Sequence, residues 1–229
     1  VRAGGLSEGP FNQNNLAFHV GDMVADVQAN RDALKAMLNL SRSPVWLNQV
    51  HGTEVIYAPD AKDIPDADGS FSDQAGVPCV VMTADCLPVL LCDQNGTQIA
   101  AVHAGWRGLA NGILRKTLSQ FSSVKNILAY LGPAVGPQAF EVGVDVREAF
   151  LGNVQNSVHR GAIKKAFIDS NTKYLADIYA LARAELHSCG VSAVHGGEFC
   201  TVNDPERFFS YRRDQVTGRN ASLIWLDGA

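Results

Sequence analysis

The sequence predicts one mixed α/β domain, of the α+β kind, over residues 1–229. Two patterns predict this fold class: apolar runs of strand length at about 78–84, 88–92 and 98–103, and longer stretches with helical spacing around them. A third observation is the lack of any internal repeat, low-complexity segment or linker-like change in composition. A chain of this length also buries enough surface to fold without disulfide or metal staples.

Local composition and periodicity predict each element in turn. Residues 1–22 are rich in glycine and asparagine and should form a loop, before a helix over 23–38. Two strands over 45–58 should meet near His51, and the aspartate- and proline-rich residues 59–76 should form a loop. The three apolar runs then predict central strands of a sheet covered on both faces. The later elements should be a helix at 107–121, a strand at 126–131, helices at 145–151 and 173–188, and strands at 191–195 and 221–226.

Charge and cysteine content narrow the functional classes. The formal net charge is −4 and no run of lysine or arginine exceeds two residues, so neither a nucleic-acid tract nor a membrane-surface helix is indicated. The apolar stretches fall short of the ~20 residues that a membrane-spanning helix needs. The five cysteines are odd in number and form no C-x-x-C pair. They indicate a reducing compartment, and the cytoplasm is the expected location.

Three good transition-metal ligands fall where an expected strand gives way to a turn marked by glycine or proline. They are His51 in Q-V-H-G, Cys86 in T-A-D-C-L-P and His103 in A-V-H-A-G. Functional groups are often held at such positions by a rigid scaffold. If the three ends converge, two histidines and one cysteine leave a fourth position open, which is typical of a catalytic zinc site. Zinc in such a site lowers the pKa of bound water to about 7.

Each of these residues also has a structural interpretation. A free cysteine most often packs as a small apolar side chain, and a lone histidine is more often hydrogen-bonded than metal-bound. Asp85, beside Cys86, lies in an apolar run where an unpaired carboxylate is costly. It should therefore pair with Arg107, His103 or a backbone amide. In doing so it could either orient a metal-bound histidine or simply form the turn.

Further polar residues are candidates for binding an anion or a substrate. Arg107 stands in a glycine-flanked turn that opens a helix, where free N–H groups favour anions, although a solvated arginine explains it equally. Tyr211, Arg212 and Arg213 in F-F-S-Y-R-R-D could hold a base and a phosphate, with a solvated strand edge as the alternative. Glu141 follows a glycine–proline region at a loop rim. No P-loop or G-x-G-x-x-G motif supports a nucleotide-binding loop.

Taken together, these motifs resemble the YfiH/laccase-domain family of bacterial polyphenol oxidase or purine nucleoside phosphorylase proteins. The resemblance follows nearly the whole chain in order and rests on N-Q-V-H-G, D-A-D-G, M-T-A-D-C-L-P-V-L, A-V-H-A-G-W-R-G, G-P-A-V-G-P, F-E-V-G and F-F-S-Y-R-R-D. It implies a single-domain mixed α/β sandwich with zinc on His51, Cys86 and His103. The family's T-R-x-G-G-V-S motif reads V-R-A-G-G-L-S, so Arg2 matches its arginine as an anion ligand, and the family's leading strand is expected to be missing.

The resemblance also implies chemistry on purine nucleosides. The expected reactions are phosphorolysis of adenosine, inosine and methylthioadenosine, and deamination of adenosine. The partners would be a purine nucleoside and phosphate, with no nucleic acid and no membrane. Zinc-activated water would attack the purine while a carboxylate such as Asp85 moves the proton. Arg2, Arg107, Arg212 and Arg213 would be the candidates to hold phosphate.

Other functions stay open beside this one. In a Cys–His hydrolase that edits peptidoglycan precursors, Cys86 would be the nucleophile and His103 the base. Copper-dependent phenol oxidation is disfavoured, because multicopper oxidases use paired histidines and this chain has six histidines without an H-x-H pair. Copper(II) could still replace zinc at the same donors, since it binds them more tightly. A non-enzymatic metal-binding role is the remaining alternative.

Overall fold

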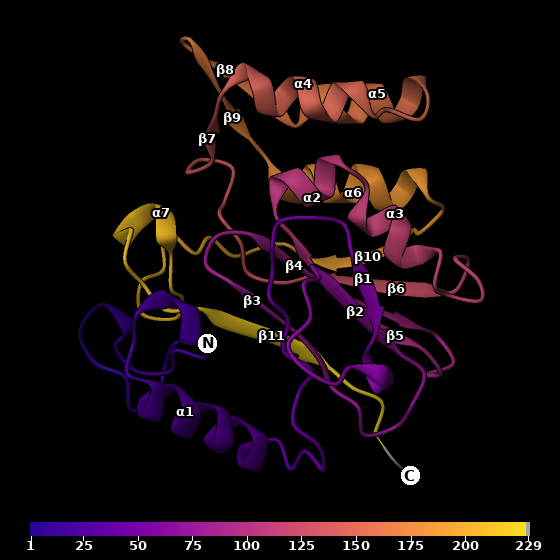
Figure 1. Ribbon diagram of the computed structural model, residues 1–229. Coiled ribbons are helices and arrows are strands. Elements are labelled where there is room, and N and C mark those ends of the chain that lie inside the picture. Colours follow the sequence, from indigo (N-terminus) through magenta and orange to yellow (C-terminus); the bar gives the residue numbers. More distant parts are fainter. Residues whose placement is uncertain (228–229) are drawn as a thin grey trace.

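A six-stranded mixed sheet forms the centre of the molecule in a computed structural model that describes residues 1–227 (Figure 1). Its strands, in spatial order, are β1 (Val55–Tyr57), β2 (Gly69–Ser72), β5 (Ile99–Ala104), β4 (Leu87–Asp93), β6 (Ile127–Leu131) and β10 (Ala193–Gly196). The outer pairs β1–β2 and β6–β10 are parallel, whereas the pairs that join β2, β5, β4 and β6 are antiparallel. This mixed sheet with its helices confirms the predicted fold class.

Two layers cover the central sheet. The helices α2 (Trp106–Ala110), α3 (Ile113–Leu118) and α6 (Ile178–Ser188) lie over one face, and the antiparallel pair β3 (Cys79–Thr83) and β11 (Asn220–Ile224) packs across β5 on the other (Figure 1). Because side chains alternate along a strand, Ala100 and Val102 join the large core on the helix side. Ile99 and Ala101 join a smaller core with β3. By the same alternation, His103 faces the β3 side.

The remaining elements surround this core. The helix α1 (Val24–Met37) is drawn below β11 in Figure 1, and its Arg31 contacts Met82 of β3. The helices α4 (Val144–Gly152) and α5 (Ser157–Lys165) stand beyond α6 (Figure 1). A small sheet contains β7 (Glu141–Val142), β9 (Lys173–Ala176) and β8 (Phe167–Ser170). The short helices are α7 (Tyr211–Asp214), η1 (Gly9–Phe11), η2 (Phe18–Val20) and η3 (Ala58–Asp60). Within residues 1–227, no helix has the length and apolar character needed to cross a membrane.

Most of the predicted central elements are confirmed. The strands β3, β4, β5, β6, β10 and β11 and the helices α1 and α4 lie within a few residues of their expected ranges. The helix α1 differs in its packing, because Val24 and Met37, two of the apolar residues whose spacing predicts the helix, are exposed. Its buried residues are Val27, Asn30 and Leu34. The polar Asn30 is buried because its amide donates to Ser7 and to two backbone carbonyls.

Other predicted boundaries are wrong. The helix expected over 107–121 is broken at Gly112, whose φ of 86° is left-handed. The helix expected over 173–188 begins at Ile178, because residues 173–176 pair as β9. The loop expected over 59–76 contains β2, and the region 45–58 contains one strand rather than two. For β2 and β9, pairing with other strands outweighs the local pattern.

Candidate active site

The antiparallel pairing of β4 with β5 brings two of the predicted metal ligands together. Leu87, the first residue of β4, pairs with Ala104, the last residue of β5. Cys86 stands immediately before β4, in the kink that follows β3, and His103 stands immediately before Ala104. The sheet register therefore makes Cys86 and His103 neighbours in space, although they are far apart along the chain.

The third predicted ligand, His51, is held by Asp68 rather than by a strand. The buried carboxylate of Asp68 accepts the backbone N–H groups of His51 at 2.9 Å and Gly52 at 2.6 Å. Here His51 adopts a left-handed φ of 60°, which is uncommon for a residue with a side chain. The carbonyl of Asp68 accepts the N–H of His103 at 2.7 Å. Asp68 thus joins the loop of His51 to the end of β5.

The same carboxylate orients the imidazole of His103. Oδ1 of Asp68 lies 2.7 Å from Nδ1 of His103, and both side chains are buried. Because a carboxylate only accepts hydrogen bonds, Nδ1 carries the proton and Nε2 is the nitrogen available to a metal. Orientation of a metal-binding histidine was one of the roles predicted for Asp85, and the structure places Asp68 in that position.

The three predicted ligands form one compact group of donors. The nitrogen and sulfur donors of His51, Cys86 and His103 all lie within 4.8 Å of one another, and no other such group occurs in residues 1–227. Sγ of Cys86 lies 3.8 Å from Nε2 of His51. Gly105 leaves room beside them, because a Cβ there would lie 3.0 Å from Cδ2 of His51 and 3.2 Å from Sγ of Cys86. Two imidazoles and one thiolate suit a transition metal, so this donor set fits the predicted cofactor class.

Electrostatics favour a thiolate at Cys86. Burial raises the pKa of the Cys86 thiol, but His103 and His51 more than offset this and bring that pKa down to about 6. Burial lowers the pKa of His103, but Cys86 and Asp68 more than offset this and raise that pKa to about 9. Without a metal, Cys86 and His103 therefore form an ion pair near neutral pH. A bound cation would replace the proton of His103 Nε2 and pair with the thiolate.

Asp85 lies beside Cys86 but makes its hydrogen bonds elsewhere. It has a left-handed φ of 90°, a strained conformation for aspartate. Its Oδ1 accepts the hydroxyl of Thr201 and its Oδ2 accepts the backbone N–H of Arg212, both at 2.6 Å. Of the three partners predicted for this carboxylate, a backbone amide is the one observed. Asp85 therefore ties the start of α7 to the turn that carries Cys86.

The donor group opens into a cavity of about 730 Å³, a size that suits small-molecule ligands. Four apolar side chains form part of the wall: Trp106, Val135, Phe140 and Ile178. Polar and basic side chains form another part: His19, Asp85, Tyr211, Arg212 and Arg219. The cavity therefore offers a metal-binding group, an aromatic surface and positive charge to one small ligand or to two.

Two of the predicted substrate residues, Tyr211 and Arg212, line this cavity from α7. Both are exposed, and Nη1 of Arg212 donates to the carbonyl of Glu141 at 3.0 Å. The carboxylate of Glu141, also predicted to contact substrate, instead pairs with Lys173 at 2.6 Å and does not line the cavity. Of these three residues, only those of α7 are placed to meet a ligand.

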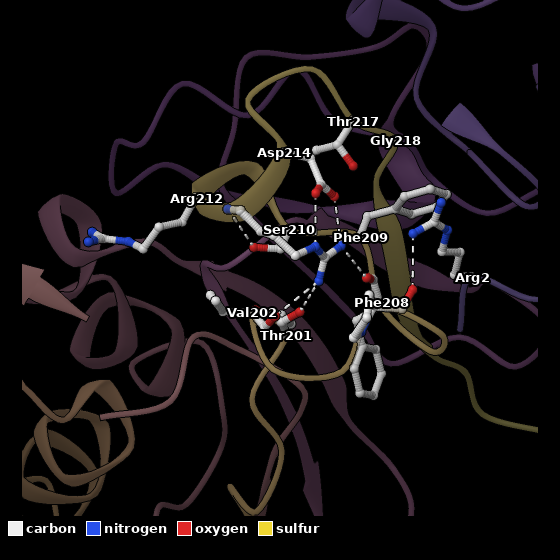
Figure 2. A network of polar contacts seen from close by, with 12 residues as sticks. Arg2, Thr201, Val202, Phe208, Phe209, Ser210, Arg212, Asp214, Thr217 and Gly218 are labelled. Carbon is white, nitrogen blue, oxygen red and sulfur yellow. Dashed lines mark hydrogen bonds and ion pairs between the residues drawn. The ribbon is translucent and has the colours of Figure 1, made fainter. Parts of the chain in front are cut away.

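Arg213 holds the backbone around α7 together. Its partners Thr201, Phe208 and Asp214 are labelled in Figure 2. Its guanidinium donates to the carbonyls of Thr201 at 2.8 Å and Phe208 at 3.1 Å and pairs with Asp214 at 2.7 Å. Because these groups occupy its N–H donors outside the cavity lining, the geometry gives no support to phosphate binding by Arg213.

Arg2 and Arg107 also lie outside the cavity lining. Nη1 of Arg2 donates to the carbonyl of Pro205 at 3.0 Å. The guanidinium carbon of Arg2 lies 4.9 Å from the ring centre of Phe209 (Figure 2). Arg107 is exposed and stacks on Trp106, with 4.4 Å between its guanidinium carbon and the ring centre. The geometry therefore does not support phosphate binding by either residue.

Sequence reasoning missed Asp68 and two basic residues of the cavity, Arg219 and His19. Asp68 lies in the D-A-D-G motif and was open to detection, because a carboxylate before an apolar strand needs partners. Arg219 and His19 carry no local signal: the first is a lone arginine in T-G-R-N and the second lies in an expected loop. Only the pairing of β11 with β3 places Arg219 beside the cavity.

The fold and the site together define a class: a mixed α/β sandwich with a metal-binding His–Cys–His group that opens into a small-molecule cavity. The chain belongs to the family described as multi-copper polyphenol oxidoreductase laccase, whose model matches residues 1–227. Within those residues the structure shows one group of this kind that could hold a metal ion.

Similar proteins carry a different activity in their names. The chain is 52% identical over 228 residues to proteins named purine nucleoside phosphorylase YfiH from Shigella flexneri and Escherichia coli, covering 99% of this chain and 91% of each relative. Among solved structures, a Neisseria meningitidis protein of the DUF152 family has a TM-score of 0.93 at 49% identity, with 99% of this chain and 92% of that chain covered. YlmD from Geobacillus stearothermophilus has a TM-score of 0.87 at 30% identity, with 99% and 90% covered. The resemblance to the YfiH/laccase-domain family is thereby confirmed.

Proposed function

We propose that this chain is a metal-dependent purine nucleoside phosphorylase acting on adenosine, inosine and methylthioadenosine. In this reaction a phosphate oxygen bonds to C1′ of the sugar while the bond from C1′ to the purine N9 breaks. The bonding electrons leave with the purine, which takes up a proton, and the products are the free base and the sugar 1-phosphate. Family membership supports the proposal, because several relatives carry this activity in their names.

The observation that carries the proposal is that one cavity joins an aromatic wall to basic side chains. Trp106 and Phe140 offer apolar surfaces for a purine base. Arg212 and Arg219 supply positive charge for an anion. Ribosyl transfer passes through a cationic sugar that an anion held beside it stabilises. A cavity with both surfaces can hold the base and phosphate together, as the reaction requires.

The metal in this proposal is zinc, held by His51, Cys86 and His103. When bound, zinc would supply a Lewis acid and an acidified water to this end of the cavity. Asp68 would keep the Nδ1 proton of His103 in place, and Asp85, the one carboxylate of the cavity lining, would move the proton that deamination of adenosine requires. Copper(II) would compete for the same three donors.

The test is to incubate the metal-loaded protein with adenosine, with and without inorganic phosphate, and to identify products by chromatography. Adenine and ribose 1-phosphate should form only with phosphate, and inosine in both samples would identify the deaminase activity. The Cys86→Ser variant, which loses one metal donor, should lose metal and product together. Absence of adenine and inosine from metal-loaded wild-type protein would contradict the proposal.

A second candidate is a Cys–His hydrolase acting on peptidoglycan precursors, with Cys86 as the nucleophile and His103 as the base. The contact of Cys86 with a second imidazole, that of His51, also favours it. Sγ lies 3.8 Å from Nε2 of His51, and the pKa of the thiol is lowered to about 6. A thiolate beside an imidazole is an activated nucleophile. Chelation separates the two candidates, because a thiolate hydrolase would keep its activity without metal and a metal-dependent phosphorylase would lose it.

We also propose a cytoplasmic location. All five cysteines are unpaired, and free thiols persist in reducing compartments. Fractionation of cells that produce the protein would test this location, and recovery of the protein outside the cytoplasmic fraction would contradict it.

A further inference from the structure

Building on the proposed function, we infer that the phosphate substrate binds at a basic corner of the cavity, made of Arg219 and His19 with Arg31 behind them. The ligand chemistry is a phosphate dianion, with inorganic phosphate as its source. The 5′-phosphate of a nucleotide has the same chemistry, and the test below separates the two sources. None of these three residues is among the substrate residues predicted from the sequence.

Arg219 is held so that part of its guanidinium stays available. Its backbone N–H donates to Oδ1 of Asn15 at 3.0 Å, and its Nη1 donates to the carbonyls of Thr217 at 2.9 Å and Gly218 at 3.1 Å. No group of residues 1–227 accepts a hydrogen bond from Nε or Nη2, and the side chain lines the cavity. A guanidinium fixed on one side presents its other donors in the planar fork that binds two phosphate oxygens.

Arg31 extends this positive surface, and His19 adds an imidazole that can donate a hydrogen bond. His19 lines the same cavity from η2. The guanidinium carbon of Arg31 lies 4.3 Å from the ring centre of Phe18 and 3.7 Å from that of Trp46. Its Nη2 lies 3.9 Å from Sδ of Met82, which is itself part of the cavity wall. Arg31 therefore lies behind Met82, outside the cavity surface.

The positive charge at this corner has no acid directly paired with it. Within the described part of the chain, Arg219, His19 and Arg31 form no ion pair with a carboxylate. Burial lowers the pKa of His19, and Arg219 and Arg31 lower that pKa further. Basic groups that repel one another in a partly buried site gain when a dianion enters between them.

The basic corner is better suited to phosphate than the other arginine of the cavity. Arg212 is exposed on α7 and donates to the carbonyl of Glu141. Arg219 is less exposed and interacts electrostatically with Cys86 and Asp85, and its guanidinium carbon is 5.9 Å from the ring centre of Tyr211. Phosphate bound at Arg219 would thus share the cavity with the metal donors and the aromatic wall. That placement brings a phosphate oxygen toward the sugar.

The experiment is calorimetric titration of inorganic phosphate, and separately of adenosine 5′-monophosphate, into metal-loaded protein. Arg219→Gln should raise the Kd for inorganic phosphate about 10- to 100-fold, because it removes charge-assisted hydrogen bonds. Arg219→Lys keeps the charge without the fork and should raise the Kd less. The matched control is Arg160→Gln, which makes the same charge change at an exposed position of α5 and should leave the Kd unchanged.

Three results would overturn the inference. The first is wild-type affinity for inorganic phosphate in folded Arg219→Gln and Arg219→Lys proteins. The second is loss of phosphate affinity in Arg212→Gln but in neither Arg219 variant. The third is binding of the nucleotide that depends on Arg219, with no binding of inorganic phosphate. Phosphorolysis with an unchanged KM for phosphate in Arg219→Gln would refute the basic corner and leave the proposed function standing. Arg219-dependent phosphate binding without any phosphorolysis would support the basic corner and contradict the proposed function.

Discussion

Asp68 supports two of the three metal donors, so its replacement by asparagine tests how the site is built. One carboxylate oxygen meets Nδ1 of His103 at 2.7 Å and the N–H of His51 at 2.9 Å. The other accepts from Gly52 at 2.6 Å and from Val50 at 3.3 Å. Asparagine has a single acceptor oxygen, so its NH₂ group must face one of these two pairs of donors. The variant keeps the shape of the side chain and loses two hydrogen bonds.

The expected losses can be stated for stability and for metal binding. A hydrogen bond to a charged group contributes about 1.5–3 kcal/mol, and the contact at 3.3 Å is at the weak end. Asp68→Asn should therefore lower the free energy of unfolding of the metal-free protein by about 2–4 kcal/mol. Loss of the partner of a metal-binding histidine should weaken zinc binding about 10- to 100-fold.

Zinc affinity would be measured by competition with a chromophoric chelator, and stability by urea unfolding of the metal-free protein. Asp66→Asn is the matched control, since Asp66 belongs to the same D-A-D-G motif but is exposed and accepts from Asn48 at 2.6 Å. The control should stay within about 0.5 kcal/mol of wild type and keep its zinc affinity. Wild-type zinc affinity in Asp68→Asn, or equal losses in both variants, would refute this account of the site.

Three more predictions concern Cys86, Gly105 and His159. In the metal-free protein, ultraviolet absorbance should show the Cys86 thiol ionising with a midpoint of about 6. The stability that this lowered pKa contributes is fully present above the ordinary thiol pKa and is lost as pH falls through that midpoint. An unshifted midpoint would contradict the influence of the histidines. Gly105→Ala places a Cβ 3.0 Å from Cδ2 of His51, at a backbone φ of −61° that alanine adopts readily. Zinc affinity should fall at least about tenfold, with little change in the urea midpoint of the metal-free protein. Unchanged zinc affinity would show that the ligands can move aside. Burial, followed by the charge of Arg115, lowers the pKa of His159, and these two effects outweigh the carboxylate of Glu185, which lies 3.4 Å from Nε2. Stability should therefore be full above the ordinary histidine pKa and fall as pH drops below it. Urea titrations should show a flatter pH dependence in His159→Gln, and equal slopes would disprove the link.

The metal donors could be predicted because their residue types are unusual where they occur. A histidine or cysteine at a glycine- or proline-marked break in an apolar run is visible without knowing which segments meet. The structure brings His51, Cys86 and His103 within 4.8 Å of one another. The central strands could also be predicted locally, because a strand buried on both faces is a continuous apolar run in the sequence.

The roles of the arginines could not be predicted from the sequence, because their side chains are chemically alike and their partners lie far along the chain. Arg213 donates to carbonyls near residue 201, whereas the backbone of Arg219 is fixed by Asn15. The same limit applies to the carboxylates: Asp68, and not Asp85, orients His103, because the sheet register sets that contact.

By itself, the sequence determined the fold class and the family and singled out the three residues of the candidate donor group, because these depend on residue type, local order and periodicity. Only the tertiary structure decided which charged groups face the cavity and which are occupied by backbone carbonyls. The physical reason is that a charged side chain is positioned by whichever partners the folded chain brings within hydrogen-bonding distance. Those partners belong to other strands and loops, and their positions exist only once the sheet has formed.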